Sequence, residues 1–223
     1  MAQPWNTLAT FDAEEGLMEL RQRGAKDFLI TVGGLVLMNS RQNRSEVVLG
    51  QLGCEKLGQQ NLPRVLVGGL GMGYTLKAVL DSLTDNAEVT VAELNPTVVE
   101  WCRGPLAVLT DAVVDDPRVM VEIADVAQLV KQCAARGVTY DAVVFDLYKG
   151  PHAKTDKIHD PLYGRRAIDD VRKILNPGGR FVVWGENYDQ GFDQRLQQAG
   201  FMTASRRPGK GGYRHVVFVA DCP

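Results

Sequence analysis

The sequence lacks the features that would place the protein in a membrane or outside the cell. Its 223 residues include no apolar run long enough to cross a bilayer, and residues 1–6 do not have the pattern of a signal peptide. The four cysteines are widely spaced and form no C-x-x-C pair, which is typical of buried or incidental thiols in a reducing compartment. We therefore expect a cytoplasmic protein, and we expect no metal site.

An excess of charge of one sign is also missing. The 25 Lys and Arg residues against 27 Asp and Glu residues give a net charge of −2, and no block of basic residues stands out. We therefore expect no nucleic acid and no membrane as a partner. With 45% hydrophobic residues, the chain is long enough to bury one full core with a small appendage beside it.

The central motif is a glycine-rich turn between a predicted strand and a predicted helix. Val65–Val67 is an apolar run typical of a buried strand, four of the six residues from Gly68 to Gly73 are glycines, and Tyr74–Leu83 has the length and apolar spacing of a helix. Backbone N–H groups at such a turn can face a nucleotide-like ligand. The spacing is neither the G-x-G-x-x-G of dinucleotide-binding proteins nor a P-loop, and an ordinary tight turn in an α/β protein is the alternative interpretation.

The segments around this motif divide the chain into two parts, residues 1–60 and 61–223. The first part predicts a β-hairpin or small meander with a turn at Gly33–Gly34, followed by a helix over 46–57 with Ser45 as its N-cap. The second part predicts strands that alternate with helices, then a closing antiparallel pair. A helix over 165–175 is predicted to stop at Asn176–Gly179, and a further helix over 189–199 is predicted before the closing pair. The predicted strands are 17–21, 28–32, 35–38, 65–67, 88–92, 118–123, 141–145, 180–184, 201–205 and 213–220.

Three acidic residues, Glu93, Asp125 and Asp146, directly follow predicted strands. The carboxyl ends of parallel strands form the edge of an α/β sheet where ligands bind. Glu93 lies 20 residues after Gly73, a distance at which an acid can accept hydrogen bonds from ribose hydroxyls. For each acid alone, ligand binding is no better an explanation than a solvated residue or one that favours the start of the next helix. The three together, beside a glycine turn, indicate an adenosine-containing cofactor.

These motifs belong to a wider pattern that covers most of the chain. Its segments are Leu35–Gln42, Val65–Leu76, Val89–Pro96, Asp116–Asp125, Tyr140–Asp146, Leu162–Tyr163 and Leu175–Trp184. Together they resemble the class I S-adenosylmethionine-dependent methyltransferase superfamily, and within it the spermidine synthase (polyamine aminopropyltransferase) branch. The resemblance implies a Rossmann-like α/β fold with a seven-stranded, mostly parallel sheet that ends in an antiparallel hairpin, and a short N-terminal β-hairpin extension.

The same resemblance implies roles for individual residues. Glu93 would hold the ribose and Asp125 the adenine amino group, while Asp146 would stand at the reacting centre as base or orienting group, with Tyr148 as a second catalytic candidate. The residues implied to bind the cofactor, S-adenosylmethionine or its decarboxylated form, are Gln42, Gly68, Gly69, Gly71, Gly73, Glu93, Leu94, Asp125, Val126 and Asp146.

Candidates for contact with the substrate lie mostly in or beside the predicted loop 147–161, which is long enough to be a lid. They are Arg41, Lys149, His152, His159 and Tyr163, and Arg44 could face the same cleft. For the two histidines, exposure on a loop is the simpler interpretation, and for Tyr163 it is packing at the start of a helix.

Two departures from the family pattern bear on the reaction. Met72 stands where aminopropyltransferases carry an aspartate that pairs with the propylamine of the decarboxylated cofactor, and Lys149 lies in a loop that reads Asp-x-x-Asp-Pro in that family. A cation facing a cationic amine in a partly dry site would cost about 1–4 kcal/mol. We therefore expect the intact cofactor to bind more tightly, and methyl transfer to a small-molecule acceptor. The alternatives are aminopropyl transfer and a catalytically silent cofactor-binding scaffold, and a homodimer is a possible assembly.

Overall fold

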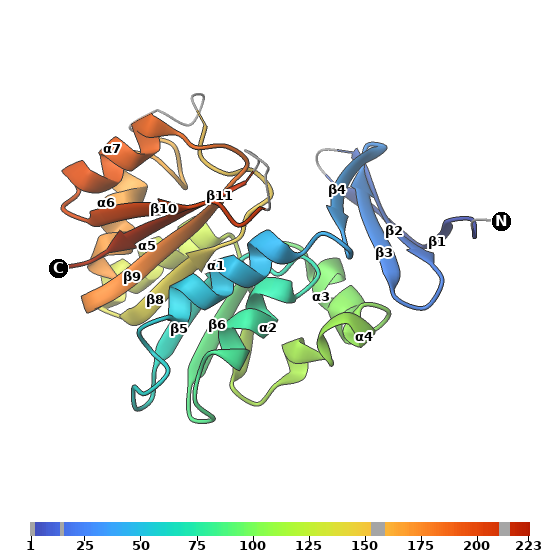
Figure 1. Cartoon of the computed structure of the whole chain (residues 1–223), viewed down its shortest axis with the longest axis horizontal. Coiled ribbons are helices and arrows are strands. Elements are labelled where there is room, and N and C mark those ends of the chain that lie inside the picture. Colours follow the sequence, from blue (N-terminus) through green and yellow to red (C-terminus); the bar gives the residue numbers. More distant parts are fainter. Residues whose placement is uncertain (1–2, 14–15, 153–158, 210–214) are drawn as a thin grey trace.

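The computed structural model describes residues 3–13, 16–152, 159–209 and 215–223, and it contains two β-sheets. The smaller sheet is N-terminal and stands to one side of the larger one (Figure 1). Its antiparallel strands, in order, are β1 (Asn6–Ala13), β2 (Gly16–Arg23), β3 (Asp27–Val32) and β4 (Leu35–Asn39). The turn predicted at Gly33–Gly34 joins β3 to β4.

The small sheet is larger than the expected hairpin because β1 was not predicted. Most residues of β1 are exposed, so the strand has no continuous apolar face for a sequence pattern to reveal. It is held by its pairing with β2 along the edge of the sheet. β3, in contrast, is buried along its whole length, which agrees with its apolar sequence.

The larger sheet has the predicted seven strands. In spatial order they are β10 (Met202–Arg206), β11 (Val216–Asp221), β9 (Leu175–Gly185), β8 (Tyr140–Phe145), β5 (Arg64–Gly68), β6 (Glu88–Glu93) and β7 (Val119–Ile123). The strands from β9 to β7 are parallel, and β11 and β10 close the sheet as an antiparallel pair. This arrangement confirms the predicted Rossmann-like fold.

Helices cover both faces of this sheet, because neighbouring residues of its central strands point to opposite sides and most of them are apolar. Val65 and Val67 of β5 pack into one core, whereas Leu66 packs into the other. The first core includes residues of α1 (Arg44–Cys54), α2 (Tyr74–Asp81) and α3 (Pro96–Arg103), and the second includes residues of α5 (Val126–Arg136), α6 (Arg165–Lys173) and α7 (Gln190–Gln198). Short α4 (Ala107–Thr110) and the 3-10 turn η1 (Val113–Asp115) follow α3.

Two predicted helix boundaries were wrong. Asn43, not Ser45, precedes α1, and Ser45 lies buried in the first turn. The Asn176–Gly179 segment lies inside β9, since α6 already ends at Lys173. The pairing of β8 with β9 shifts its register there, and Asn176 donates a hydrogen bond from its side chain to Asp141 at 2.8 Å, so a bulged strand accommodates the Pro–Gly–Gly sequence.

Other sequence expectations can also be compared with the structure. All four cysteines are buried and none is in a disulfide. No helix in the described part of the chain is long and apolar enough to cross a membrane. The predicted strand 213–220 begins at Val216 in the structure, and part of the predicted lid, residues 153–158, lies outside the described residues.

Gly69 marks the closest approach between the glycine turn and β8. Its φ is +89°, and a Cβ atom there would collide with the carbonyl oxygen of Asp146. We expect Gly69→Ala to lower the free energy of unfolding by about 2 kcal/mol or more, because left-handed backbone costs a non-glycine residue about 1–2 kcal/mol and forced overpacking adds about 1–3 kcal/mol. Urea denaturation measures the loss.

Gly137 provides a matched control for this substitution. Its φ is +68°, but a Cβ atom there would meet nothing within 4 Å. Gly137→Ala should therefore lower the free energy of unfolding by only the roughly 1–2 kcal/mol that left-handed backbone costs a residue other than glycine. Equal losses for the two variants would show that the glycine turn is not pressed against β8.

Candidate functional site

The glycine turn is fixed by backbone contacts with the strand ends beside it. Gly69 donates from its N–H to the carbonyl of Ala92 in β6 at 2.9 Å, and Asp146 donates from its N–H to the carbonyl of Gly68 at 2.9 Å. Gly73, with φ of 83°, then turns the chain into α2. The turn therefore holds the ends of β6 and β8 at one edge of the sheet, where the sequence predicted a ligand.

Glu93 ends β6 and supports the turn directly. One carboxylate oxygen accepts from the N–H of Leu70 and the other from the N–H of Asn95, each at 2.9 Å. A carboxylate offers about four acceptor positions, so each oxygen keeps capacity for another donor. Glu93 is thus fixed in place while it can still accept hydrogen bonds from a diol such as ribose.

The loop after β7 adds a second set of groups that fit an adenosine. Asp125 is exposed and caps α5, accepting from the N–H of Ala127 at 2.8 Å, and Val126 behind it is buried. Leu94 is 73% exposed, although a leucine beside a strand end is more often covered. Leu94, which directly follows Glu93 after β6, thus offers exposed apolar surface that suits a flat ring such as adenine.

Asp146 ends β8 on the other side of the turn. Its side chain is half-buried and accepts a hydrogen bond from the hydroxyl of Thr75, in the first turn of α2, at 2.5 Å. Burial, together with the charge of Glu46 on α1, raises the pKa of Asp146 to about 7 against the lowering effect of the Thr75 bond. A carboxyl group with this pKa exchanges a proton readily near neutral pH.

The chain after Asp146 turns outward. Tyr148 and Lys149 are exposed, and the Lys149 amine lies 5.2 Å from the centre of the Tyr148 ring. No ion pair in the described part of the chain joins Lys149 to Asp146. Lys149 therefore gives less reason than the sequence suggested to exclude a cationic substrate.

Tyr163 lies beneath this loop. It is buried, and its hydroxyl donates to the carbonyl of Lys149 at 2.7 Å, while its ring packs edge-on against Phe192. Burial, with the charges of Asp160 and Asp146, holds the pKa of the Tyr163 hydroxyl above its ordinary value. The structure thus supports the packing interpretation of Tyr163, in which this residue fixes the base of the loop.

The remaining candidates are spread more widely. Arg41 forms an ion pair with Asp27 at 2.8 Å and so is turned toward the small sheet. Gln42 and Arg44 are exposed near the start of α1, and His152 and His159 are exposed on either side of the residues that are not described. The cofactor contact expected of Gln42 and the substrate contacts expected of Arg41, Arg44, His152 and His159 stay predictions.

Sequence reasoning missed two residues that the structure places beside Asp146, Thr75 and Glu46. Thr75 was counted only as part of the helix after the glycine turn. Glu46 was counted only as the first residue of a predicted helix, and nothing in its spacing to the strand-end acids identifies it. Its approach to Asp146 depends on how α1 packs across α2 and the sheet.

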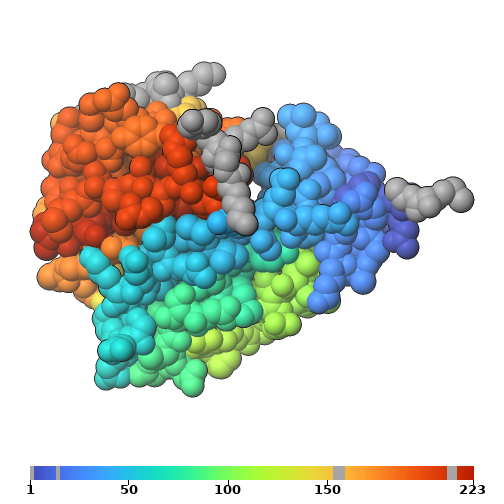
Figure 2. Space-filling view, viewed as in Figure 1, coloured from blue at the N-terminus to red at the C-terminus, as the bar shows by residue number. Residues whose placement is uncertain are grey.

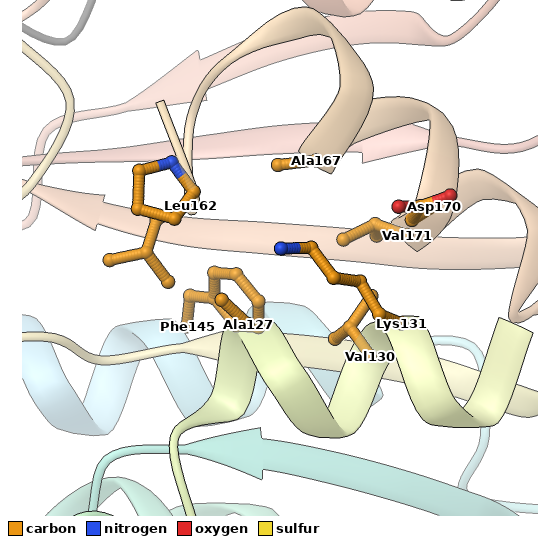
Figure 3. Close-up of a pocket in the computed structure, with 9 residues that line it drawn as sticks. Ala127, Val130, Lys131, Phe145, Leu162, Ala167, Asp170 and Val171 are labelled. Carbon is orange, nitrogen blue, oxygen red and sulfur yellow. The ribbon is translucent and has the colours of Figure 1, made fainter. Parts of the chain in front are cut away.

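A small cavity lies away from this edge, between α5 and α6. Phe145 and Leu162 line it together with Ala127, and the amine of Lys131 reaches toward it (Figure 3). Its volume of about 10 Å³ has room for one water molecule at most. The candidate site is the open edge formed by the glycine turn and the strand ends, because Glu93 and Asp146 lie there.

The seven-stranded sheet and the glycine turn at its strand ends are those of a class I S-adenosylmethionine-dependent transferase fold. Residues 48–193, more than half of the chain, match the model of the spermine/spermidine synthase domain. The chain therefore belongs to the spermine/spermidine synthase domain family.

Individual relatives agree with this assignment. The chain is 36% identical over 125 residues to polyamine aminopropyltransferase 1 of Hyperthermus butylicus, covering 55% of this chain and 41% of the relative. It is 31% identical over 130 residues to a polyamine aminopropyltransferase of Korarchaeum cryptofilum, covering 58% of this chain and 37% of the relative. The matched region thus spans well under half the length of these relatives.

The fold is similar to that of a solved spermidine synthase from Thermotoga maritima. The TM-score is 0.72 at 18% identity, over 96% of this chain and 72% of that structure. The relatives favour the aminopropyltransferase alternative over the methyltransferase that we expected first. The cytoplasmic location and the homodimer stay predictions.

Glu93 is the residue through which binding of an adenosine-containing ligand can be tested. Hydrogen bonds to a charged acceptor contribute roughly 1.5–3 kcal/mol each, so Glu93→Ala should weaken binding of 5′-methylthioadenosine at least about tenfold. Calorimetry measures the dissociation constant. An unchanged constant, with the circular dichroism spectrum of the wild type, would show that Glu93 only supports the glycine turn.

Proposed function

We propose that the protein transfers an aminopropyl group from decarboxylated S-adenosylmethionine to a small amine. Membership of the spermine/spermidine synthase domain family and the relatives named above support this proposal. The observation that carries it within the site is the charge around Asp146. Glu46 lies close enough to raise the pKa of Asp146, and no ion pair in the described residues compensates either acid.

Two uncompensated carboxyl groups favour cationic ligands at this end of the cleft. The intact cofactor would bring a third carboxylate toward them, whereas the decarboxylated donor and an amine acceptor bring only positive charge. This balance reverses the expectation drawn from Met72. In the structure the uncharged Met72 side chain is 1% exposed and packed in the core, so it does not line the cleft.

The residues of the site can perform the steps of aminopropyl transfer. A bound sulfonium donor supplies an activated carbon, to which the acceptor nitrogen bonds as the S–C bond breaks and its electron pair passes to sulfur. Glu93 and the glycine turn orient the donor, and ionised Asp146 accepts the proton that leaves the acceptor nitrogen. Thr75 holds the Asp146 carboxylate toward the cleft by its 2.5 Å hydrogen bond.

Methyl transfer is the second candidate, because Met72 leaves the glycine turn without an acid to pair with a propylamine.

The two candidate functions differ in the donor that the protein binds and uses, so the identity of this donor distinguishes them. We expect 1,4-diaminobutane incubated with the protein to gain an aminopropyl group from decarboxylated S-adenosylmethionine, as followed by mass spectrometry. We also expect calorimetry to show tighter binding of the decarboxylated donor. Methylated product, with tighter binding of the intact cofactor, would contradict the proposal.

Asp146 should control the rate of this transfer. Positioned bases contribute about 10²–10⁴-fold, so Asp146→Asn should lower kcat on that scale while donor binding stays within a few-fold. Because Asp146 must be ionised and its pKa is about 7, the wild-type rate should rise with pH through about 7.

Asp111 supplies the matched control. It is exposed after α4, and its left-handed φ of 58° is one that asparagine also adopts. Asp111→Asn should leave kcat and the pH profile unchanged. If Asp146→Asn transfers as fast as the wild type, the acceptor arrives already deprotonated and Asp146 is not the base.

A further inference from the structure

Glu46 is held by a chain of hydrogen bonds that starts on a distant part of the sequence. The hydroxyl of Ser45 donates to the Glu46 carboxylate at 2.7 Å, and the same hydroxyl oxygen lies 3.1 Å from Nδ1 of His215. Since the hydroxyl has one hydrogen and directs it to Glu46, Nδ1 must be the donor to Ser45. The chain thus runs from His215 through buried Ser45 to Glu46 and fixes the carboxylate.

His215 is itself fixed in this position. Its N–H donates to the carbonyl of Glu186 at 2.8 Å, and its ring lies edge-on to Trp184 with 5.1 Å between the ring centres. Its φ of 61° is uncommon for a residue other than glycine. Three segments, the starts of α1 and β11 and the end of β9, therefore meet at the Ser45 hydroxyl.

One further hydroxyl joins Glu46 to the reacting centre. Thr75 Oγ1 lies 2.5 Å from the carboxylate of Asp146 and 3.3 Å from the main-chain carbonyl of Glu46. The one hydrogen of the Thr75 hydroxyl goes to Asp146, so its approach to the Glu46 carbonyl shows only that the first turn of α1 lies next to the end of β8. The negative charge of Glu46 also acts on Tyr74, whose hydroxyl donates to the carbonyl of Ser40. The Thr75 contacts place the first turn of α1, and with it Glu46, beside the glycine turn and the end of β8.

The order of the strands shows on which side of Asp146 this carboxylate lies. Along the sheet the order is β6, β5, β8, β9 and β11, so Glu93 after β6 and His215 before β11 lie on opposite sides of Asp146. A donor whose ribose lies at Glu93 reaches Asp146 from the β6 side. The β9–β11 side, where Ser45 and His215 hold Glu46, is left for the acceptor. Figure 2 shows α1 between the N-terminal strands and the C-terminal part of the chain on this face.

We propose that Glu46 is an acceptor-binding residue, whose carboxylate holds the ammonium group of the amine and presents its second nitrogen to Asp146. The inference rests on the proposed aminopropyl transfer. It assigns Ser45 and His215 to positioning, because Ser45 contacts Glu46 and His215 contacts Ser45. The opposing view is that Glu46 only complements the positive N-terminal end of α1, as an acid in the first turn of any helix does.

The first test is kinetic. We expect Glu46→Gln to raise the KM for 1,4-diaminobutane roughly 10- to 100-fold, the size expected for loss of a charged hydrogen bond, with kcat within a few-fold. Glu100→Gln, an exposed acid of α3 with no described side-chain bond, is the control and should change neither value. An unchanged KM in Glu46→Gln would overturn the proposal.

The second test does not depend on activity. A ¹³C NMR titration of the Asp146 carboxyl should give a lower pKa in Glu46→Gln than in the wild type or Glu100→Gln, because a facing negative charge is removed. The groups that face Asp146 are Glu46 from α1, Thr75 from α2 and Tyr163 before α6, and only Glu46 among them is an acid. Glu46→Asp keeps the charge and should keep the raised pKa. If Glu46→Gln does not fold, Glu46→Ala, which also removes the charge, replaces it, and Glu46→Asp remains the charge-keeping control.

Failure of the proposed function is distinguishable from failure of this inference. If the wild type transfers no aminopropyl group, the function is wrong, and binding of 1,4-diaminobutane in the presence of 5′-methylthioadenosine then decides the role of Glu46. Calorimetric binding by the wild type that weakens at least about tenfold in Glu46→Gln supports an amine site. Equal binding by both proteins, or no binding by the wild type, overturns it.

Discussion

The close approach of the glycine turn to the end of β8 is the constraint on which the site depends. Gly69 leaves no room for a Cβ atom against the Asp146 carbonyl, and its N–H is bound to β6 on the other side. The turn is therefore fixed between the strands that carry Glu93 and Asp146. Both acids owe their positions to this contact, since Glu93 binds the N–H of Leu70 and Asp146 binds the hydroxyl of Thr75 just after the turn.

Burial of acids near one another gives the site its chemistry. Taking Asp146 out of water beside Glu46 disfavours its ionised form, which raises its pKa to about 7 and prepares it to exchange a proton at neutral pH. A cationic ligand between the two groups would relieve the same strain. Under the proposed function, the free-energy cost of holding the two acids near one another without a ligand would favour binding of an amine.

The larger sheet and the strand-end acids could be predicted because their signals are local. Apolar runs such as Val65–Val67 and Asp141–Phe145 are followed by a glycine or an acid. A short, continuous apolar run of this kind is typical of a buried parallel strand. β1 has no such signal, because it is an exposed edge strand held only by its neighbour. Glu46 and His215 are 169 residues apart in sequence, and only the packing of α1 across β9 and β11 brings them to one hydroxyl.

A crystal structure with 5′-methylthioadenosine and 1,4-diaminobutane tests the central claim most directly. The account predicts that the ribose hydroxyls lie on Glu93 and that one nitrogen of the diamine lies within hydrogen-bond distance of Asp146 while the other contacts Glu46. A ribose bound elsewhere, or a diamine that avoids both carboxyl groups, would contradict the account.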